Sequence, residues 1–77
     1  MAEEIIHRFA KNSNDDVVFR VYEFKGKTYF DIRIYTTLPG EIDKVPTKKG
    51  ISLRLEKIED MKTGLKGLEE AIGKLQG

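Results

Sequence analysis

The chain of 77 residues has no cysteine, no tryptophan and a single histidine, His7. Without cysteine, neither a disulfide nor a thiolate metal site can form. A lone histidine with no second ligand nearby in sequence gives no histidine-based metal site either. We therefore expect no metal and no cofactor, and we interpret His7 as a surface or edge residue rather than a ligand.

Long apolar runs are also missing. No run approaches the roughly 20 residues that cross a bilayer, and Glu3 and Glu4 stand where a signal peptide would carry basic residues. We expect a soluble, cytoplasmic protein with no membrane partner, nucleoid-associated if its source is bacterial.

The short length limits how the chain can be stabilised. A domain of this size buries only about 60% of the surface that its unfolded chain exposes. Small domains are usually supported by disulfides, metals or oligomerisation. Because the first two are excluded, we expect one domain over residues 1–77 that forms an oligomer.

Positive charge is concentrated in the middle of the chain. The net charge is only +1, but residues 17–54 hold eight Lys or Arg against four Asp or Glu, whereas both flanking segments are net negative. This bias is compatible with an anionic partner.

The clearest pattern is the alternation in residues 19–35, FRVYEFKGKTYFDIRIY. Phe19, Val21, Phe30, Ile32 and Ile34 alternate with polar and aromatic residues on both sides of a Lys25-Gly26 turn. Period-two alternation around a glycine-containing turn predicts an antiparallel hairpin. One of its faces would then combine aromatic rings with cations, from Arg20, Tyr22, Tyr29, Arg33 and Tyr35.

The remaining elements follow from turns and periodicity. We expect strands at about 4–11, 17–24, 28–36 and 49–54, with residues 36–47 forming a loop that contains Pro39-Gly40 and Pro46. A helix is expected at about 56–75. The predicted fold is α+β, a four-stranded antiparallel meander followed by one long helix.

The predicted helix has a wide apolar stripe. One helix on one small sheet leaves part of this stripe exposed, so we expect a homodimer that pairs helix to helix. Gly64 within the stripe costs about 1 kcal/mol of helix propensity and suggests a close approach of another element. The expected dimer interface consists of Ile58, Met61, Gly64, Leu65, Leu68 and Ile72.

Three motifs favour nucleic-acid binding, and each also has a plain structural interpretation. In Phe24-Lys25-Gly26-Lys27, a glycine lets the backbone approach a phosphate that two lysines neutralise, but the segment also fits an ordinary turn. The aromatic and cationic strand face can stack bases or be a polar surface with paired charges. Lys48 and Lys49 can clamp a backbone or protect an edge strand from aggregation.

In combination, FKGK, DIR and KKGISL resemble the single-stranded-DNA-binding domain of the positive cofactor 4 type of transcriptional coactivator, in its short bacterial form. The resemblance covers residues 17–58. It implies a strongly curved sheet, a dimer through the helices, and binding of single-stranded or melted DNA with little sequence preference, in transcription.

The resemblance also implies roles for residues. Phe24 would stack on a base, Lys25, Gly26 and Lys27 would hold the nucleic-acid backbone, Arg33 would be a cation in the groove, and Lys48 and Lys49 would flank the last strand. Stacking by Tyr22 or Tyr29 is our own inference from the pattern. Relatives often have a large aromatic residue where this chain has Thr36, so one stacking ring is missing.

Two alternatives remain. The same sheet can serve as a protein-interaction module of the transcription machinery with weak or no nucleic-acid binding, and RNA can replace DNA because stacking and phosphate contacts do not read the 2′-hydroxyl. An enzyme is not expected, because Asp31, Glu41 and Asp43 have no histidine, cysteine or nucleophile motif beside them.

Overall fold

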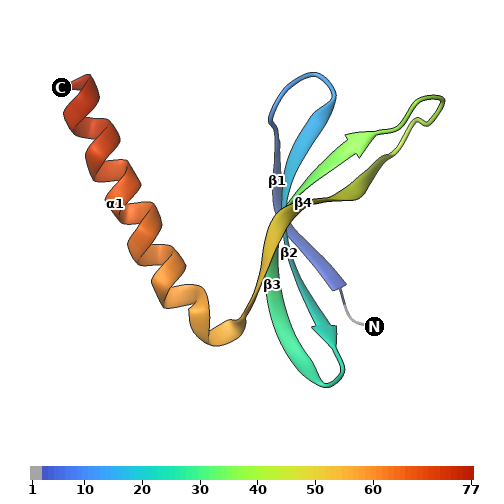
Figure 1. Cartoon of the computed structure of the whole chain (residues 1–77), viewed down its shortest axis with the longest axis horizontal. Coiled ribbons are helices and arrows are strands. Elements are labelled where there is room, and N and C mark those ends of the chain that lie inside the picture. The colour runs from blue at the N-terminus through green and yellow to red at the C-terminus, as the bar shows by residue number, and fades with distance from the viewer. Residues whose placement is uncertain (1–2) are drawn as a thin grey trace.

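The computed structural model describes residues 3–77 and contains four strands followed by a helix (Figure 1). The strands are β1 (Glu3–Ala10), β2 (Asp15–Phe24), β3 (Lys27–Thr37) and β4 (Lys44–Arg54). A 3₁₀ turn, η1 (Leu55–Lys57), leads into the helix α1 (Ile58–Gln76). The α+β fold predicted from the sequence is confirmed.

The strands form one antiparallel meander in the order β1-β2-β3-β4. In the central hairpin Arg20 pairs with Asp31 and Tyr22 pairs with Tyr29. The polar and aromatic side chains of both strands therefore lie on the same face of the sheet. We call the face that carries Arg20, Tyr22, Asp31 and Arg33 the polar face. The opposite face, which carries Phe19 and the other apolar residues of the alternation, is the apolar face.

The predicted loop at 36–47 is too long and the predicted start of the fourth strand is too late. β4 begins at Lys44 rather than at residue 49, and it includes Pro46. The register shifts between Arg33, which pairs with Gly50, and Tyr35, which pairs with Pro46. This irregularity accommodates a proline within a strand, because the regular ladder of hydrogen bonds is already interrupted there.

The helix extends away from the sheet instead of packing along it (Figure 1). None of its residues is buried, and its start has no side-chain cap. The radius of gyration is 14.9 Å, whereas about 11.5 Å is expected for a compact domain of this length. A side chain at Gly64 would meet open space, so the single chain gives no reason for that glycine. No helix within residues 3–77 has the length and apolar character needed to cross a membrane.

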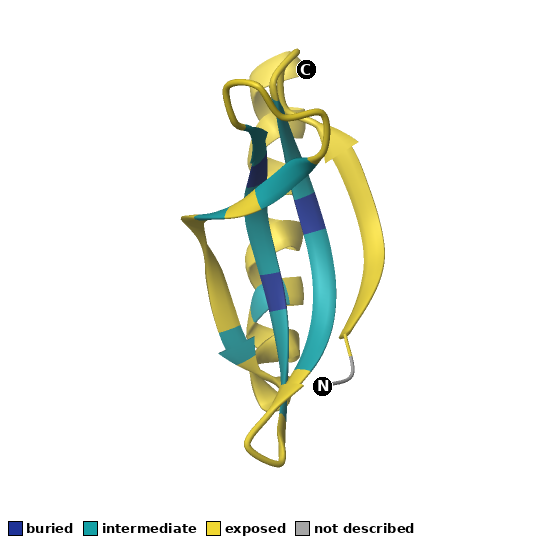
Figure 2. Ribbon diagram, turned by 90° about the vertical axis from the view of Figure 1, so that its right-hand side faces the viewer, coloured by how far each residue is buried: buried dark blue, intermediate teal, exposed yellow. Residues whose placement is uncertain are grey.

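The buried residues lie on the two central strands (Figure 2), and the alternation along each strand assigns their side chains to the polar face. Val18, Asp31 and Tyr35 are the buried residues there, with 0%, 1% and 7% of their surface exposed. On the apolar side, an open cavity of about 220 Å³ lies between the sheet and the first half of α1. Phe19, Phe30 and Met61 contribute to its lining. Apolar surface on both the sheet and the helix is therefore left without a partner in one chain.

Candidate nucleic-acid interface

The β2–β3 turn places two lysines and an aromatic ring at one end of the sheet. Phe24 pairs with Lys27, and Lys25 and Gly26 between them have φ angles of 52° and 77°. Positive φ at both central residues is typical of a type I′ turn, in which Asn-Gly is the preferred pair. Lysine is disfavoured in this left-handed conformation. The Lys25 ammonium lies 5.4 Å from the centre of the half-exposed Phe24 ring.

Next to this turn, two tyrosines form a stacked pair on the polar face. The rings of Tyr22 and Tyr29 lie 5.5 Å apart and are nearly parallel, with an interplanar angle of 14°. The Arg20 guanidinium lies 5.2 Å from the centre of the Tyr22 ring. The Tyr22 hydroxyl is 2.8 Å from Ser52 Oγ. Both the ring and the hydroxyl of Tyr22 are therefore held in place.

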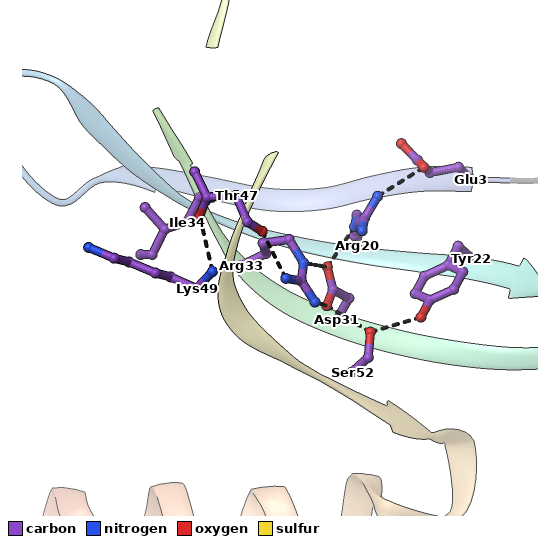
Figure 3. Close-up of polar contacts among 9 residues, drawn as sticks. All are labelled: Glu3, Arg20, Tyr22, Asp31, Arg33, Ile34, Thr47, Lys49 and Ser52. Atoms are coloured by element: carbon purple, nitrogen blue, oxygen red, sulfur yellow. Dashed lines mark hydrogen bonds and ion pairs between the residues drawn. The ribbon is translucent and has the colours of Figure 1, made fainter. Parts of the chain in front are cut away.

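The centre of the polar face is organised around the carboxylate of Asp31 (Figure 3). Its Oδ2 accepts hydrogen bonds from Arg20 Nε at 2.6 Å and Arg33 Nε at 3.0 Å. Its Oδ1 accepts from Arg33 Nη2 at 2.9 Å and from Ser52 Oγ at 2.8 Å. Because Ser52 donates its proton to Asp31, the Tyr22 hydroxyl must donate to Ser52. The carboxylate thus fixes two guanidinium groups and, through Ser52, one tyrosine.

These contacts change the acid–base properties of the groups. Burial alone would raise the pKa of Asp31, but the hydrogen bonds from Arg33, Arg20 and Ser52 outweigh it and lower the pKa. Burial likewise acts to lower the pKa of Arg20, and its hydrogen bond with Asp31 reverses this effect and raises the pKa. Both shifts favour the charged forms of Asp31 and Arg20, so this ion pair is kept at neutral pH.

The irregular segment of β4 carries the second pair of lysines. Three residues, 47–49, stand opposite the single residue Ile34. Thr47 fixes this segment, because its Oγ1 donates to the Ile34 carbonyl at 2.8 Å and accepts from the Lys49 backbone N–H at 3.2 Å. The Thr47 carbonyl accepts a hydrogen bond from Arg33 Nη1 at 2.9 Å. Arg33 is therefore linked to both Asp31 and the lysine segment.

Gly50 sits where β4 resumes its regular pairing. A Cβ atom there would lie 2.7 Å from the Ile32 carbonyl oxygen and 2.8 Å from the Arg33 Cα. Only glycine allows this close approach of the two strands. The glycine of the KKG motif thus has a structural role beside Arg33.

The structure distributes the predicted binding residues along the polar face. The FKGK turn and the tyrosine pair lie toward one end, and the Arg20–Asp31–Arg33 group lies in the middle. Lys49 lies on the far side of that group from Tyr22 (Figure 3). The described part of the chain forms no ion pair through Lys25, Lys27, Lys48 or Lys49.

One residue of the predicted set, Tyr35, and the position of the missing aromatic ring, Thr36, have other roles in the structure. Tyr35 is 7% exposed and lies beneath Arg8, whose guanidinium is 5.7 Å from its ring centre, so little of the ring is left for a base. Thr36 donates a hydrogen bond to Asp15 at 2.6 Å, which lowers the pKa of that carboxyl. The residue that replaces the missing aromatic ring therefore links β3 to the start of β2.

Sequence reasoning overlooked several residues that organise the face. From the sequence, Asp31 was considered as part of the DIR motif and as a carboxylate without catalytic neighbours, and not as the central acceptor of the face. Ser52 and Thr47 were not singled out. Glu3, which forms an ion pair with Arg20 at 3.0 Å, was considered only as an acidic residue that argues against a signal peptide. The alternation placed Asp31 on the polar face, but only the β3–β4 register shows that Ser52 lies opposite it.

No group of three or more potential metal ligands occurs within residues 3–77. The chemistry that the polar face offers is the binding of anions by lysine and arginine and the stacking of planar groups on aromatic rings.

The chain is similar to known proteins in sequence and in fold. A PC4 homolog from Burkholderia pseudomallei, BPSL1147, is 25% identical in sequence, with a TM-score of 0.80 over 88% of this chain and 98% of that one. A bacteriophage T5 homolog of the eukaryotic coactivator PC4, implicated in recombination-dependent DNA replication, is 21% identical, with a TM-score of 0.66 over 99% and 90%. At this sequence identity, the similarity to the bacteriophage protein shows a shared fold alone. Residues 11–64 match the family described as Transcriptional Coactivator p15 (PC4). The chain therefore belongs to the PC4 family of transcriptional coactivators.

Proposed function

We propose that this protein is a homodimeric binder of single-stranded or melted DNA, with little sequence preference and a role in transcription, and that it has no catalytic activity. The observation that carries the proposal is the composition of the polar face. It combines a stacked tyrosine pair with lysines that form no ion pair in the described part of the chain. Stacking rings and cations in one surface are what proteins use to bind single strands without reading the sequence.

The cations divide into two kinds. Lys25 and Lys27 at the turn and Lys48 and Lys49 in the irregular segment are exposed, so they are available to neutralise phosphates. The guanidinium of Arg33 is held by Asp31 and Thr47. Its orientation is therefore fixed, and its charge is partly neutralised by Asp31. The nucleic-acid strand would run along the polar face between the two lysine pairs. Its affinity would fall as the salt concentration rises, because binding releases counterions from the phosphates and salt makes this release less favourable.

Phe24 is the principal stacking ring in this proposal, and Tyr29 and Tyr22 are the next candidates. Residues two apart on a strand share a face and are separated by roughly 7 Å. Phe24 and Tyr22 therefore offer successive rings along β2. Tyr29 widens this aromatic surface across β3.

The homodimer is proposed from the exposed apolar surface. The single chain exposes 6207 Å², whereas about 4800 Å² is expected for a compact monomer of 8.8 kDa. The excess of about 1400 Å² exceeds the roughly 800 Å² that each partner buries in a standard interface. Leu65, Leu68 and Ile72 of α1 are 50–60% exposed. Pairing through α1 would cover this stripe and give Gly64 a close neighbour.

The site is tested with Phe24→Ala and Lys27→Ala. Phe24→Ala should weaken binding of a labelled ~20-nucleotide oligo-dT about tenfold, because a stacked base contributes roughly 1–3 kcal/mol. Lys27→Ala should weaken binding and reduce its salt dependence, because one phosphate contact is lost. Both variants should leave the dimer folded. Lys66→Ala removes an exposed lysine from α1 and should change the affinity little. Unchanged affinity in both site variants would contradict the assignment.

A protein-interaction module is the second candidate, and the β3–β4 loop favours it. Ile42 is 94% exposed and Leu38 is 48% exposed, and Glu41 and Asp43 flank Ile42 with negative charge. An apolar tip with acidic neighbours suits a protein partner better than a phosphate backbone. This candidate predicts negligible oligonucleotide binding at moderate salt and loss of the protein partner in Ile42→Asp.

A further inference from the structure

Arg20 is held from two sides by carboxylates of different character. On the inner side, its Nε donates to Oδ2 of Asp31, whose side chain is completely buried. On the outer side, its Nη1 donates to Oε2 of Glu3 at 3.0 Å, and the Glu3 side chain is 49% exposed. Figure 3 shows Glu3 reaching Arg20 from β1, on the side away from Asp31. The inner contact is part of the fold, whereas the outer one lies at the surface.

The Glu3 contact shows that an anion can reach Arg20 from solvent. Although the Arg20 side chain is only 16% exposed, an oxygen anion already sits against its outer nitrogen. Carboxylate and phosphate oxygens accept hydrogen bonds from arginine in the same geometry. The position occupied by Glu3 is therefore suited to a phosphate oxygen. It lies beside Tyr22, whose ring is 5.2 Å from the Arg20 guanidinium.

We propose that Glu3 is an internal competitor of nucleic-acid phosphate at Arg20, so that a bound strand displaces its carboxylate. This proposal rests on the proposed function and adds a specific phosphate position together with the group that occupies it in the free protein. Asp31 keeps the guanidinium in place throughout. The exchange replaces the Arg20–Glu3 ion pair with an ion pair between Arg20 and a phosphate. Because the first pair must break before the second can form, Glu3 reduces the affinity of the polar face for nucleic acid.

The chain itself provides a matched control. Glu4 is adjacent to Glu3, has the same charge, and pairs with Val21, so its side chain belongs to the apolar face. No ion pair within residues 3–77 includes it. Glu3→Gln and Glu4→Gln change the net charge equally and keep the side-chain size. Only the first one removes a negative charge from the outer side of Arg20.

The experiment compares both variants with the unmodified protein by fluorescence anisotropy with labelled ~20-nucleotide oligo-dT at 0.15 M salt. At this ionic strength charges more than about 8 Å apart are largely screened, so local contacts dominate. Because exposed ion pairs are weak, Glu3→Gln should tighten binding about two- to fivefold, and Glu4→Gln should leave it nearly unchanged. In an Arg20→Gln background, Glu3→Gln should have no further effect.

Each other outcome overturns the proposal in a recognisable way. An equal gain in both variants would mean that only the overall charge matters. Unchanged or weaker binding in Glu3→Gln would mean that Glu3 does not compete, or that it holds Arg20 in its binding position. Absence of binding by all the proteins, even at low salt, would instead contradict the proposed function itself.

Discussion

At the scale of single residues, Asp31 determines how the polar face is built. Its buried carboxylate accepts four hydrogen bonds from Arg20, Arg33 and Ser52. The alternation in the sequence placed Asp31 on the same face as Arg33. It did not reveal that Asp31 is as deeply buried as Val18, because the burial of Asp31 depends on contacts from three strands.

We expect Asp31→Asn to lower the free energy of unfolding by about 2–3 kcal/mol at pH 7. Breaking a buried ion pair costs 3–5 kcal/mol, and the partly exposed arginines recover some of this by hydration. The pKa of Asp31 is lower in the folded chain than in the unfolded chain. Its ionisation therefore stabilises the fold above the unfolded pKa of about 3.9, and this contribution is lost as the pH falls through the folded pKa.

Urea denaturation at several pH values measures this effect. The difference between the unmodified protein and Asp31→Asn should narrow below about pH 4. Asp43→Asn, which changes an exposed carboxylate in the β3–β4 loop, is the control and should have little effect. Equal stability of Asp31→Asn and the unmodified protein at pH 7 would contradict the role of Asp31.

At the scale of elements, the central hairpin was predictable, whereas only the second half of the fourth strand was. Alternation on both sides of Lys25-Gly26 specifies both strands and their turn. β4 has no such clarity, because Pro46 lies within it and the residues 47–49 interrupt its register. A proline and an irregular segment remove the local signals on which strand prediction depends. The contacts of Thr47 with Ile34 and Arg33 compensate for the lost regularity only in the folded chain.

The turn places Lys25 in a backbone conformation that lowers stability, and the proposed binding role of this lysine would explain why it is there. Lys25 occupies a left-handed conformation that asparagine adopts more readily. Lys25→Asn should therefore raise the free energy of unfolding by roughly 0.5–1 kcal/mol. It should also weaken oligonucleotide binding and reduce the slope of log affinity against log salt by about 0.7, the value for one phosphate contact on a single strand.

Thermal unfolding and a salt titration of anisotropy measure the two effects separately. Lys66→Asn on α1 is the matched substitution at an exposed helical position, where neither effect is expected. A Lys25→Asn variant that is more stable but binds with unchanged affinity and slope would show that this lysine has no part in binding.

At the scale of the whole molecule, the position of α1 is the feature that the sequence left open. The apolar stripe correctly predicted an amphipathic helix, but a stripe does not specify its partner. In one chain the helix leaves the sheet, and an open cavity remains between them. Leu65 and Leu68 stay more than half exposed, which is the physical basis for proposing a second copy.

Light scattering after size exclusion tests the dimer. The unmodified protein should have a mass of twice 8.8 kDa, and Leu68→Asp should be monomeric or unfolded because it places a charge in the proposed interface. Lys66→Asp adds the same side chain next to the stripe and should remain dimeric. A monomeric unmodified protein at micromolar concentration would contradict the proposed assembly.

The central claim is that the polar face binds single strands. The most direct measurement is the anisotropy of labelled ~20-nucleotide oligo-dT and of a duplex of the same length, each titrated with the protein at several salt concentrations. The account predicts strong preference for the single strand and an affinity that falls with salt. Equal binding of the duplex, or no binding even at low salt, would contradict it.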